Sequence, residues 1–113
     1  MLVSTDVTDR DTLDIDGRIY KLYTSARIKN ATIHSLRARN RREGEGIRTG
    51  NMTKKVKKLM CDRAVPISER ASLPLIESDG ELIYVPLCAV ADRARASTKD
   101  LELIIYIFRN ERI

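Results

Sequence analysis

The chain has 113 residues, of which 42% are hydrophobic and 33% are charged, and its formal net charge is +5. This balance predicts one globular domain, residues 1–113, and excludes both a disordered chain and one with apolar membrane spans of about 20 residues. The N-terminus lacks the basic-then-apolar pattern of a secretion signal, so we expect a cytoplasmic location and no membrane partner.

Two cysteines and one histidine limit the chemistry open to this chain. Cys61 and Cys88 form no CxxC pair, so free thiols are favoured over a disulfide and a metal site is not expected. His34 is the only histidine, and we interpret it as a structural or surface residue rather than a ligand. Carboxylates and lysines remain available for acid–base chemistry, but we expect no catalytic residue, metal or cofactor in this chain.

The N-terminal part predicts a β-hairpin. Residues 12–16 and 18–24 alternate apolar and polar side chains around Asp16-Gly17, a dipeptide suited to the positive φ angles of a tight turn. The residues before it, 1–11, are polar and acidic, and we expect them to form only a lead-in.

The next segments are basic. We expect residues 25–30 to be a connection and 31–39 a strand, whose later part would send Arg37 and Arg39 to one face. Residues 40–52 contain three glycines and three arginines and predict a flexible basic loop. The glycines match neither a dinucleotide-binding fingerprint nor a Walker sequence, so we expect no independent nucleotide pocket.

Residues 53–63 predict a short amphipathic helix. At helical spacing Val56, Leu59 and Met60 share one face, and four lysines spread over the opposite side. Thr53 is the expected N-cap, because its hydroxyl can accept a hydrogen bond from the first turn. The helix would therefore dock by its apolar face and present positive charge outward.

The C-terminal half predicts one more helix and three more strands. Pro74 ends the helix, an Asp-Gly dipeptide joins the first two strands, and the last is apolar on nearly both faces, as expected for a central strand. These elements are a helix over 67–72, a hairpin of 75–78 and 81–85, and a strand over 101–108. Strands thus outnumber helices and both helices lie mid-chain, which predicts a small mixed domain of the α+β class.

Positive charge is concentrated in one segment. Residues 27–58 hold eleven Lys or Arg against two Glu, a net charge of +9, while the remainder holds ten Lys or Arg against fourteen acidic residues, a net charge of −4. Such segregation indicates a polyanionic partner rather than uniform solubility. The expected phosphate contacts are Arg37, Arg39, Arg41, Arg42, Lys54, Lys55, Lys57 and Lys58.

Six short segments follow one another along the chain: 37–45, 52–60, 65–66, 69–70, 73–75 and 84–86. Together and in this order they resemble the C-terminal domain of tRNA(Ile)-lysidine synthetase. In that family an R-x-R-x-x-G-D segment precedes a lysine-rich helix, then I-P, a helix with E-R, a P-hydrophobic strand and W-V, and the match covers about residues 30–95. This chain departs from the pattern at Glu45, where the family has Asp, and at Tyr84, where it has Trp.

The resemblance implies a β-sandwich-like core and a role in tRNA docking. The parent family is an ATP-dependent ligase that converts the wobble cytidine of a bacterial isoleucine tRNA, with a CAU anticodon, to lysidine. Its adenylating chemistry uses an S-G-G-x-D-S loop in an N-terminal catalytic domain, and this sequence lacks that loop. The expected partners are therefore that tRNA and the catalytic domain, while ATP and Mg²⁺ belong to the catalytic domain.

Two other functions stay open from the sequence. The helices over 53–63 and 67–72 are arranged like a helix-turn-helix DNA-binding unit, although the second is short and offers mainly Arg70 to a groove. Alternatively, the domain braces a larger enzyme and its lysines are only solvated.

Overall fold

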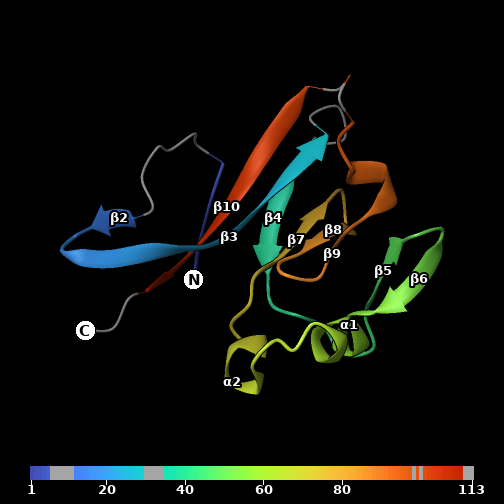
Figure 1. Cartoon of the computed structure of the whole chain (residues 1–113), viewed down its shortest axis with the longest axis horizontal. Coiled ribbons are helices and arrows are strands. Elements are labelled where there is room, and N and C mark those ends of the chain that lie inside the picture. Colours follow the sequence, from blue (N-terminus) through green and yellow to red (C-terminus); the bar gives the residue numbers. More distant parts are fainter. Residues whose placement is uncertain (6–11, 30–34, 98, 100, 111–113) are drawn as a thin grey trace.

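A computed structural model gives the fold and describes residues 1–5, 12–29, 35–97, 99 and 101–110. The predicted fold class is confirmed: the domain is small and mostly β, with two short helices in the middle of the chain (Figure 1). The helices are α1 (Val56–Asp62), α2 (Ile67–Arg70) and the 3₁₀ helix η2 (Asp92–Ala94). The strands are β1 (Leu2–Ser4), β2 (Thr12–Ile15), β3 (Arg18–Lys29), β4 (Leu36–Arg39), β5 (Gly46–Thr49), β6 (Met52–Lys55), β7 (Leu75–Ser78), β8 (Glu81–Val85), β9 (Ala89–Val90) and β10 (Glu102–Asn110).

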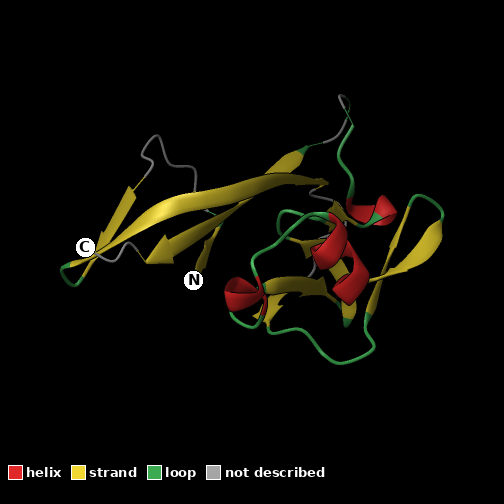
Figure 2. Cartoon of the chain, turned by 60° about the horizontal axis from the view of Figure 1, so that its bottom comes forward, coloured by secondary structure: helices red, strands yellow, loops and turns green. Residues whose placement is uncertain are grey.

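The first sheet has the antiparallel order β1-β10-β3-β2. Its inner strand β10 pairs with β1 on one side and β3 on the other, which confirms the predicted central strand. The predicted hairpin at Asp16-Gly17 is also confirmed, with φ angles of 54° and 80° at the two turn residues. In Figure 2 this sheet reaches away from the part of the molecule that carries the helices.

The second sheet has the antiparallel order β4-β7-β8-β9, and β5 and β6 form a separate hairpin. The predicted Asp79-Gly80 turn joins β7 to β8, again with positive φ at both residues, and β8 ends at Val85, before Pro86. The hydrophobic core joins the layers, because buried side chains from both sheets, β5 and α1 form one cluster. Among them are Ile28, Ile105 and Ile107 of the first sheet, Leu75, Ile76 and Ile83 of the second, Ile47 of β5, and Val56 and Met60 of α1.

Two expectations for the N-terminal part were wrong. Residues 2–4 of the expected lead-in form β1, and residues 25–29 of the expected connection continue β3. In both cases the long strand β10 supplies backbone partners, so pairing between distant segments overrides the polar local sequence. The expected strand over 31–39 is present as β4, and its residues 31–34, including His34, lie outside the described residues.

The middle of the chain differs most from expectation. Residues 46–49 and 52–55 pair as a hairpin around Gly50-Asn51, whose φ angles are 62° and 60°, so neither the flexible loop nor the helix start at 53 is correct. The helix begins at Val56, and its N-cap is Lys55, which makes no side-chain capping bond. The hairpin forms because Gly50 and Asn51 both have positive φ, as in the primed turns that join two antiparallel strands. The residues on either side of the turn are therefore aligned as strands.

Within the part of the chain that the structure describes, no helix is long and apolar enough to cross a membrane. Cys61 and Cys88 are both free, the first exposed and the second buried, in agreement with the interpretation favoured by the sequence.

Candidate nucleic-acid interface

The helix α1 has one buried and one exposed face, as its spacing predicts. Val56, Leu59 and Met60 are buried in the core, whereas Lys57 and Lys58 are exposed. Burial of three apolar side chains on so short a helix holds it against the sheets, because a seven-residue helix is not stable by itself. The two lysines are therefore carried by a fixed element.

The loop before β5 folds around a carboxylate. Glu45 accepts hydrogen bonds from the backbone N–H of Arg42 at 3.0 Å and from both terminal nitrogens of the Arg39 guanidinium, and Arg39 Nε also lies 2.7 Å from Glu77 Oε2. The loop bends at Gly44, whose φ is 74°. The result is a compact turn with its arginine side chains on the surface.

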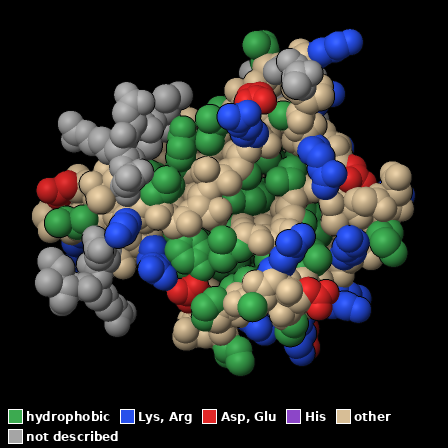
Figure 3. All heavy atoms as spheres, in the orientation of Figure 1, with side chains coloured by type: hydrophobic (Ala, Val, Ile, Leu, Met, Phe, Trp, Pro, Cys, Tyr) green, Lys and Arg blue, Asp and Glu red, His purple; other side chains and the backbone are tan. Residues whose placement is uncertain are grey.

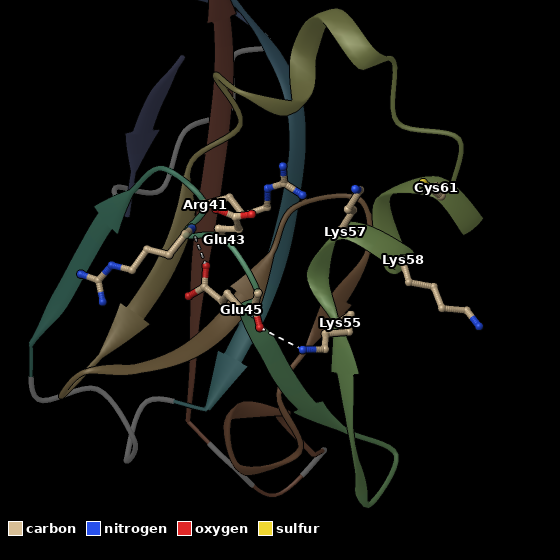
Figure 4. A pocket seen from close by; sticks show the side chains of 9 residues that line it. Arg41, Glu43, Glu45, Lys55, Lys57, Lys58 and Cys61 are labelled. Atoms are coloured by element: carbon tan, nitrogen blue, oxygen red, sulfur yellow. Dashed lines mark hydrogen bonds between the residues drawn. The ribbon is translucent and has the colours of Figure 1, made fainter.

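This loop and the chain from β6 into α1 enclose an open hollow of about 870 Å³ (Figure 4). The two walls are joined by the backbone, since Val56 N–H donates to Glu45 O at 3.0 Å, and by Lys55 Nζ, which lies 3.2 Å from Gly44 O. The lining residues are Arg41, Arg42, Glu43, Gly44, Glu45, Lys55, Lys57, Lys58 and Cys61.

The structure brings together five of the eight predicted contacts: Arg41, Arg42, Lys55, Lys57 and Lys58. They come from segments that are more than ten residues apart in sequence. Five residues with cationic side chains thus line one hollow together with two glutamates, and one of these, Glu45, is paired with Arg39.

The other three predicted contacts lie elsewhere. Lys54 lines a neighbouring hollow with Arg63, and Lys55 and Lys58 line both hollows. Arg37 is exposed on β4 and paired in register with Glu77. Arg39 is largely buried, with 12% of its side chain exposed, and its guanidinium is committed to two carboxylates.

The charge states of this network follow from its contacts. Burial raises the pKa of Glu45, but the hydrogen bonds from Arg39 and from the Arg42 backbone outweigh burial, so the pKa is lower than that of an ordinary carboxyl. The Arg39 hydrogen bond also lowers the pKa of Glu77, and the Glu45 hydrogen bond raises the already high pKa of Arg39. All three groups are charged at neutral pH.

Sequence reasoning missed two acidic residues that shape this surface. One is Glu45, and its place as an acidic residue close to a run of arginines was the feature of the sequence that could have indicated an ion pair. The other is Asp92 of η2, whose carboxylate accepts hydrogen bonds from Gly50 N–H at 2.9 Å and Asn51 N–H at 2.8 Å and so holds the tip of the β5–β6 hairpin. These bonds lower the pKa of Asp92. Nothing in the local sequence signals this contact.

The surrounding surface is basic. Figure 3, in the orientation of Figure 1, shows most visible Lys and Arg side chains over the half of the molecule that carries β5, β6 and α1. Among the residues that the structure describes, no group of three or more His, Cys, Asp or Glu is placed to hold a metal ion. The arrangement is suited to binding anions by charge and hydrogen bonding.

Comparison with known proteins gives a consistent result. Residues 36–106, more than half of the chain, match the family described as "TilS substrate C-terminal domain". A solved structure, "Crystal structure of TILS C-terminal domain", matches 90% of this chain and 92% of its own with a TM-score of 0.62 and 20% identity, a likeness that shows the fold.

Two curated relatives are each 35% identical to this chain over 54 residues. They are the tRNA(Ile)-lysidine synthases of Streptococcus pyogenes serotypes M6 and M18. The match covers 48% of this chain but only 13% of each relative, so the chain corresponds to a small part of those proteins.

Proposed function

This chain belongs to the TilS substrate C-terminal domain family, and from that membership we propose that it is the tRNA-docking module of a tRNA(Ile)-lysidine synthase. The family resemblance expected from the sequence is confirmed. The module's task is to bind the isoleucine tRNA with a CAU anticodon and to hold it for a catalytic domain.

The observation that carries the proposal is the charge of the hollow. Five of its lining residues are cationic and two, Glu43 and Glu45, are acidic, and Glu45 is paired with Arg39. Contacts between arginine or lysine and phosphates supply much of the affinity of proteins for nucleic acids, because binding releases counterions. We assign direct phosphate contact to Arg41, Arg42, Lys55, Lys57 and Lys58, with Arg37 and Lys54 at the edges of the same basic surface and Arg39 beneath it.

The chemistry of this surface favours folded RNA over an unpaired strand. The chain has only four Tyr and one Phe, and Tyr84 and Phe108 are buried, so few rings remain for stacking on bases. Lysine and arginine contacts to phosphates position a nucleic acid without reading its sequence. The module therefore recognises the shape and backbone of a tRNA.

In this proposal the catalytic part of the enzyme binds ATP and Mg²⁺ and performs the ligation. The docking module adds affinity and orientation to that reaction. The isolated chain is then expected to show no stoichiometric binding of ATP in calorimetry with Mg²⁺, and a tight, salt-resistant ATP complex would contradict this division of labour.

The decisive experiment is a salt titration of binding. Filter binding of the isolated chain to unmodified isoleucine tRNA, between about 50 and 200 mM salt, should give a slope of log K against log salt near −3 to −5 if about four to six phosphates are neutralised. A salt-independent affinity would refute the electrostatic account. Duplex DNA and single-stranded RNA of equal length are the comparison ligands.

The comparison ligands separate the two alternatives. A preference for duplex DNA would favour a helix-turn-helix function, which the structure gives little room for because α2 has four residues, none of them buried. Failure to bind any of the three nucleic acids would favour a module that only braces the enzyme.

A further inference from the structure

Glu45 lies where the two walls of the basic hollow meet, and we propose that it is a positioning residue that sets the geometry of the cations facing the RNA. The inference rests on the proposed function of that hollow. It assigns a role to an acidic residue in a site whose ligand is a polyanion.

The side chain of Glu45 shapes the arginine wall. Its carboxylate holds the Arg42 N–H at 3.0 Å, and the Glu45 N–H donates back to Arg42 O at 3.3 Å. The turn between these two residues is thereby closed at both ends. Arg42 lies in this turn and Arg41 directly precedes it, and both residues line the hollow.

The backbone of Glu45 positions the lysine wall. Its carbonyl accepts the hydrogen bond of Val56 N–H, the first residue of α1, at 3.0 Å. The next residue, Gly46, pairs in register with Lys55. A shift of Glu45 would therefore move the arginine turn relative to the helix that carries Lys57 and Lys58.

Arg39, which binds the Glu45 carboxylate, is itself held by a second carboxylate. Arg39 binds Glu45 with its terminal nitrogens and Glu77 with Nε, at 2.7 Å, and the side chains of Glu45 and Glu77 are only 10% and 7% exposed. Removing one partner from such a buried pair would leave an uncompensated charge, which is strongly unfavourable, so the three side chains are held together. The network connects the loop to β4 and β7 of the second sheet.

The sign of a mutational effect distinguishes positioning from charge. If only charge mattered, removing a carboxylate from a site for RNA would strengthen binding. Glu45→Gln removes the charge but also exchanges one acceptor oxygen for an NH₂ group, which then faces a donor, either Arg39 or the Arg42 N–H. Positioning therefore predicts weaker binding although the net charge becomes more positive.

Glu43→Gln is the matched control. Glu43 belongs to the same loop, lines the same hollow and is exposed, and it makes none of the contacts that define the Glu45 network. The substitution changes the net charge by the same amount. Its tRNA affinity should be equal to or higher than that of the parent chain.

The test measures tRNA affinity at several salt concentrations for the parent chain and both variants. Glu45→Gln should bind about three- to tenfold more weakly, with a salt slope shallower by about one for each phosphate that the variant no longer neutralises. Hydrogen exchange at the amides of Arg42 and Val56 should also become faster. If Glu45→Gln binds as well as Glu43→Gln, the inference is wrong and the proposed function stands. If the parent chain does not bind tRNA, the proposed function fails instead.

Arg39→Lys provides a second variant without a change in net charge. A lysine ammonium cannot bridge Glu45 and Glu77 in the forked geometry of a guanidinium, so this variant should show the same direction of effect. Thermal melts followed by circular dichroism identify the temperature range over which each variant is folded. Loss of the fold in both variants would overturn the inference, since the network would then serve stability rather than the position of the cations.

Discussion

The phenol of Tyr23 donates a hydrogen bond to the Glu69 carboxylate and so ties β3 of the first sheet to α2. Tyr23 is the extra residue of a β-bulge, because Thr24 pairs with Ile107 and Leu22 with Phe108 on β10. Arg109 completes the contact: its guanidinium lies 2.8 Å from Glu69 Oε1 and 5.1 Å from the centre of the Tyr23 ring.

Replacement of Tyr23 by Phe should lower the free energy of unfolding by about 1 to 2 kcal/mol, since it removes a hydrogen bond to a charged group while Glu69 keeps Arg109. Burial and the Glu69 bond raise the Tyr23 pKa to about 12. A phenol with a raised pKa contributes stability below its unfolded pKa, near 10, and that contribution is lost as pH rises through about 12. Urea unfolding at neutral pH and across this alkaline range measures both effects.

Tyr84→Phe is the control for this prediction. Burial also raises the pKa of Tyr84 to about 12, so ultraviolet titration of the parent should show two phenols that ionise there. Each single variant should lose one of them. Equal unfolding free energies for Tyr23→Phe and the parent at neutral pH would show that the bond to Glu69 contributes nothing.

Acid should weaken the fold through Glu45 and Glu77. The pKa of each is lowered in the folded state. Burial raises the pKa of Glu45, but the hydrogen bond from Arg39 opposes and outweighs it. The hydrogen bond from Arg39 is also the largest cause of the lowered pKa of Glu77. Stability from such groups is present above the ordinary carboxyl pKa of about 4.3 and is lost as pH falls through the lowered folded pKa. Denaturant unfolding from neutral pH into acid should show this decline, and Glu77→Gln should be less stable at neutral pH but decline less.

The two faces of α1 should respond oppositely to substitution. Lys57→Gln and Lys58→Gln should leave thermal stability near that of the parent, because exposed lysines in a cationic cluster add little to folding. Each should weaken tRNA binding and reduce the salt slope by about one. Leu59→Ala should instead cost about 2 to 5 kcal/mol, because Leu59 is buried in the core.

The charge-matched control for the lysines is Arg18→Gln. Arg18 is exposed at the β2–β3 hairpin, on the opposite side of the molecule from α1 (Figure 1). The salt slope should stay unchanged in this variant. If Arg18→Gln and the lysine variants reduce binding equally, only total charge matters and the hollow is not the site.

Gly46→Ala should destabilise the chain because space is lacking. A Cβ at this position would lie 2.8 Å from Thr53 Cγ2 and 3.2 Å from the Lys54 carbonyl oxygen, and overpacking of this kind costs about 1 to 3 kcal/mol. Adding Thr53→Ser removes the methyl group and should restore part of the loss. Thermal melts of a double-mutant cycle decide it, and strictly additive effects would exclude a direct clash.

The sequence by itself determined the features that depend on local chemistry. The Asp16-Gly17 and Asp79-Gly80 turns, the buried face of α1 and the apolar strand β10 were predictable because turn conformation and hydrophobic spacing are encoded within a few residues. The family was recognisable from the order of its motifs, and the segregation of charge was evident from composition.

Only the tertiary structure decided which cations face the same hollow. Lys54 and Lys55 lie on a strand because residues 46–55 form a hairpin, and of the two only Lys55 lines the hollow beside the arginine loop. In sequence, Arg39 looks like the other arginines of residues 37–42. In the structure it is largely buried and is paired with Glu77, 38 residues away. Both outcomes depend on contacts between segments that are distant in sequence. The free energy of these contacts comes from burial and from ion pairs with carboxylates, and local sequence patterns do not reveal either.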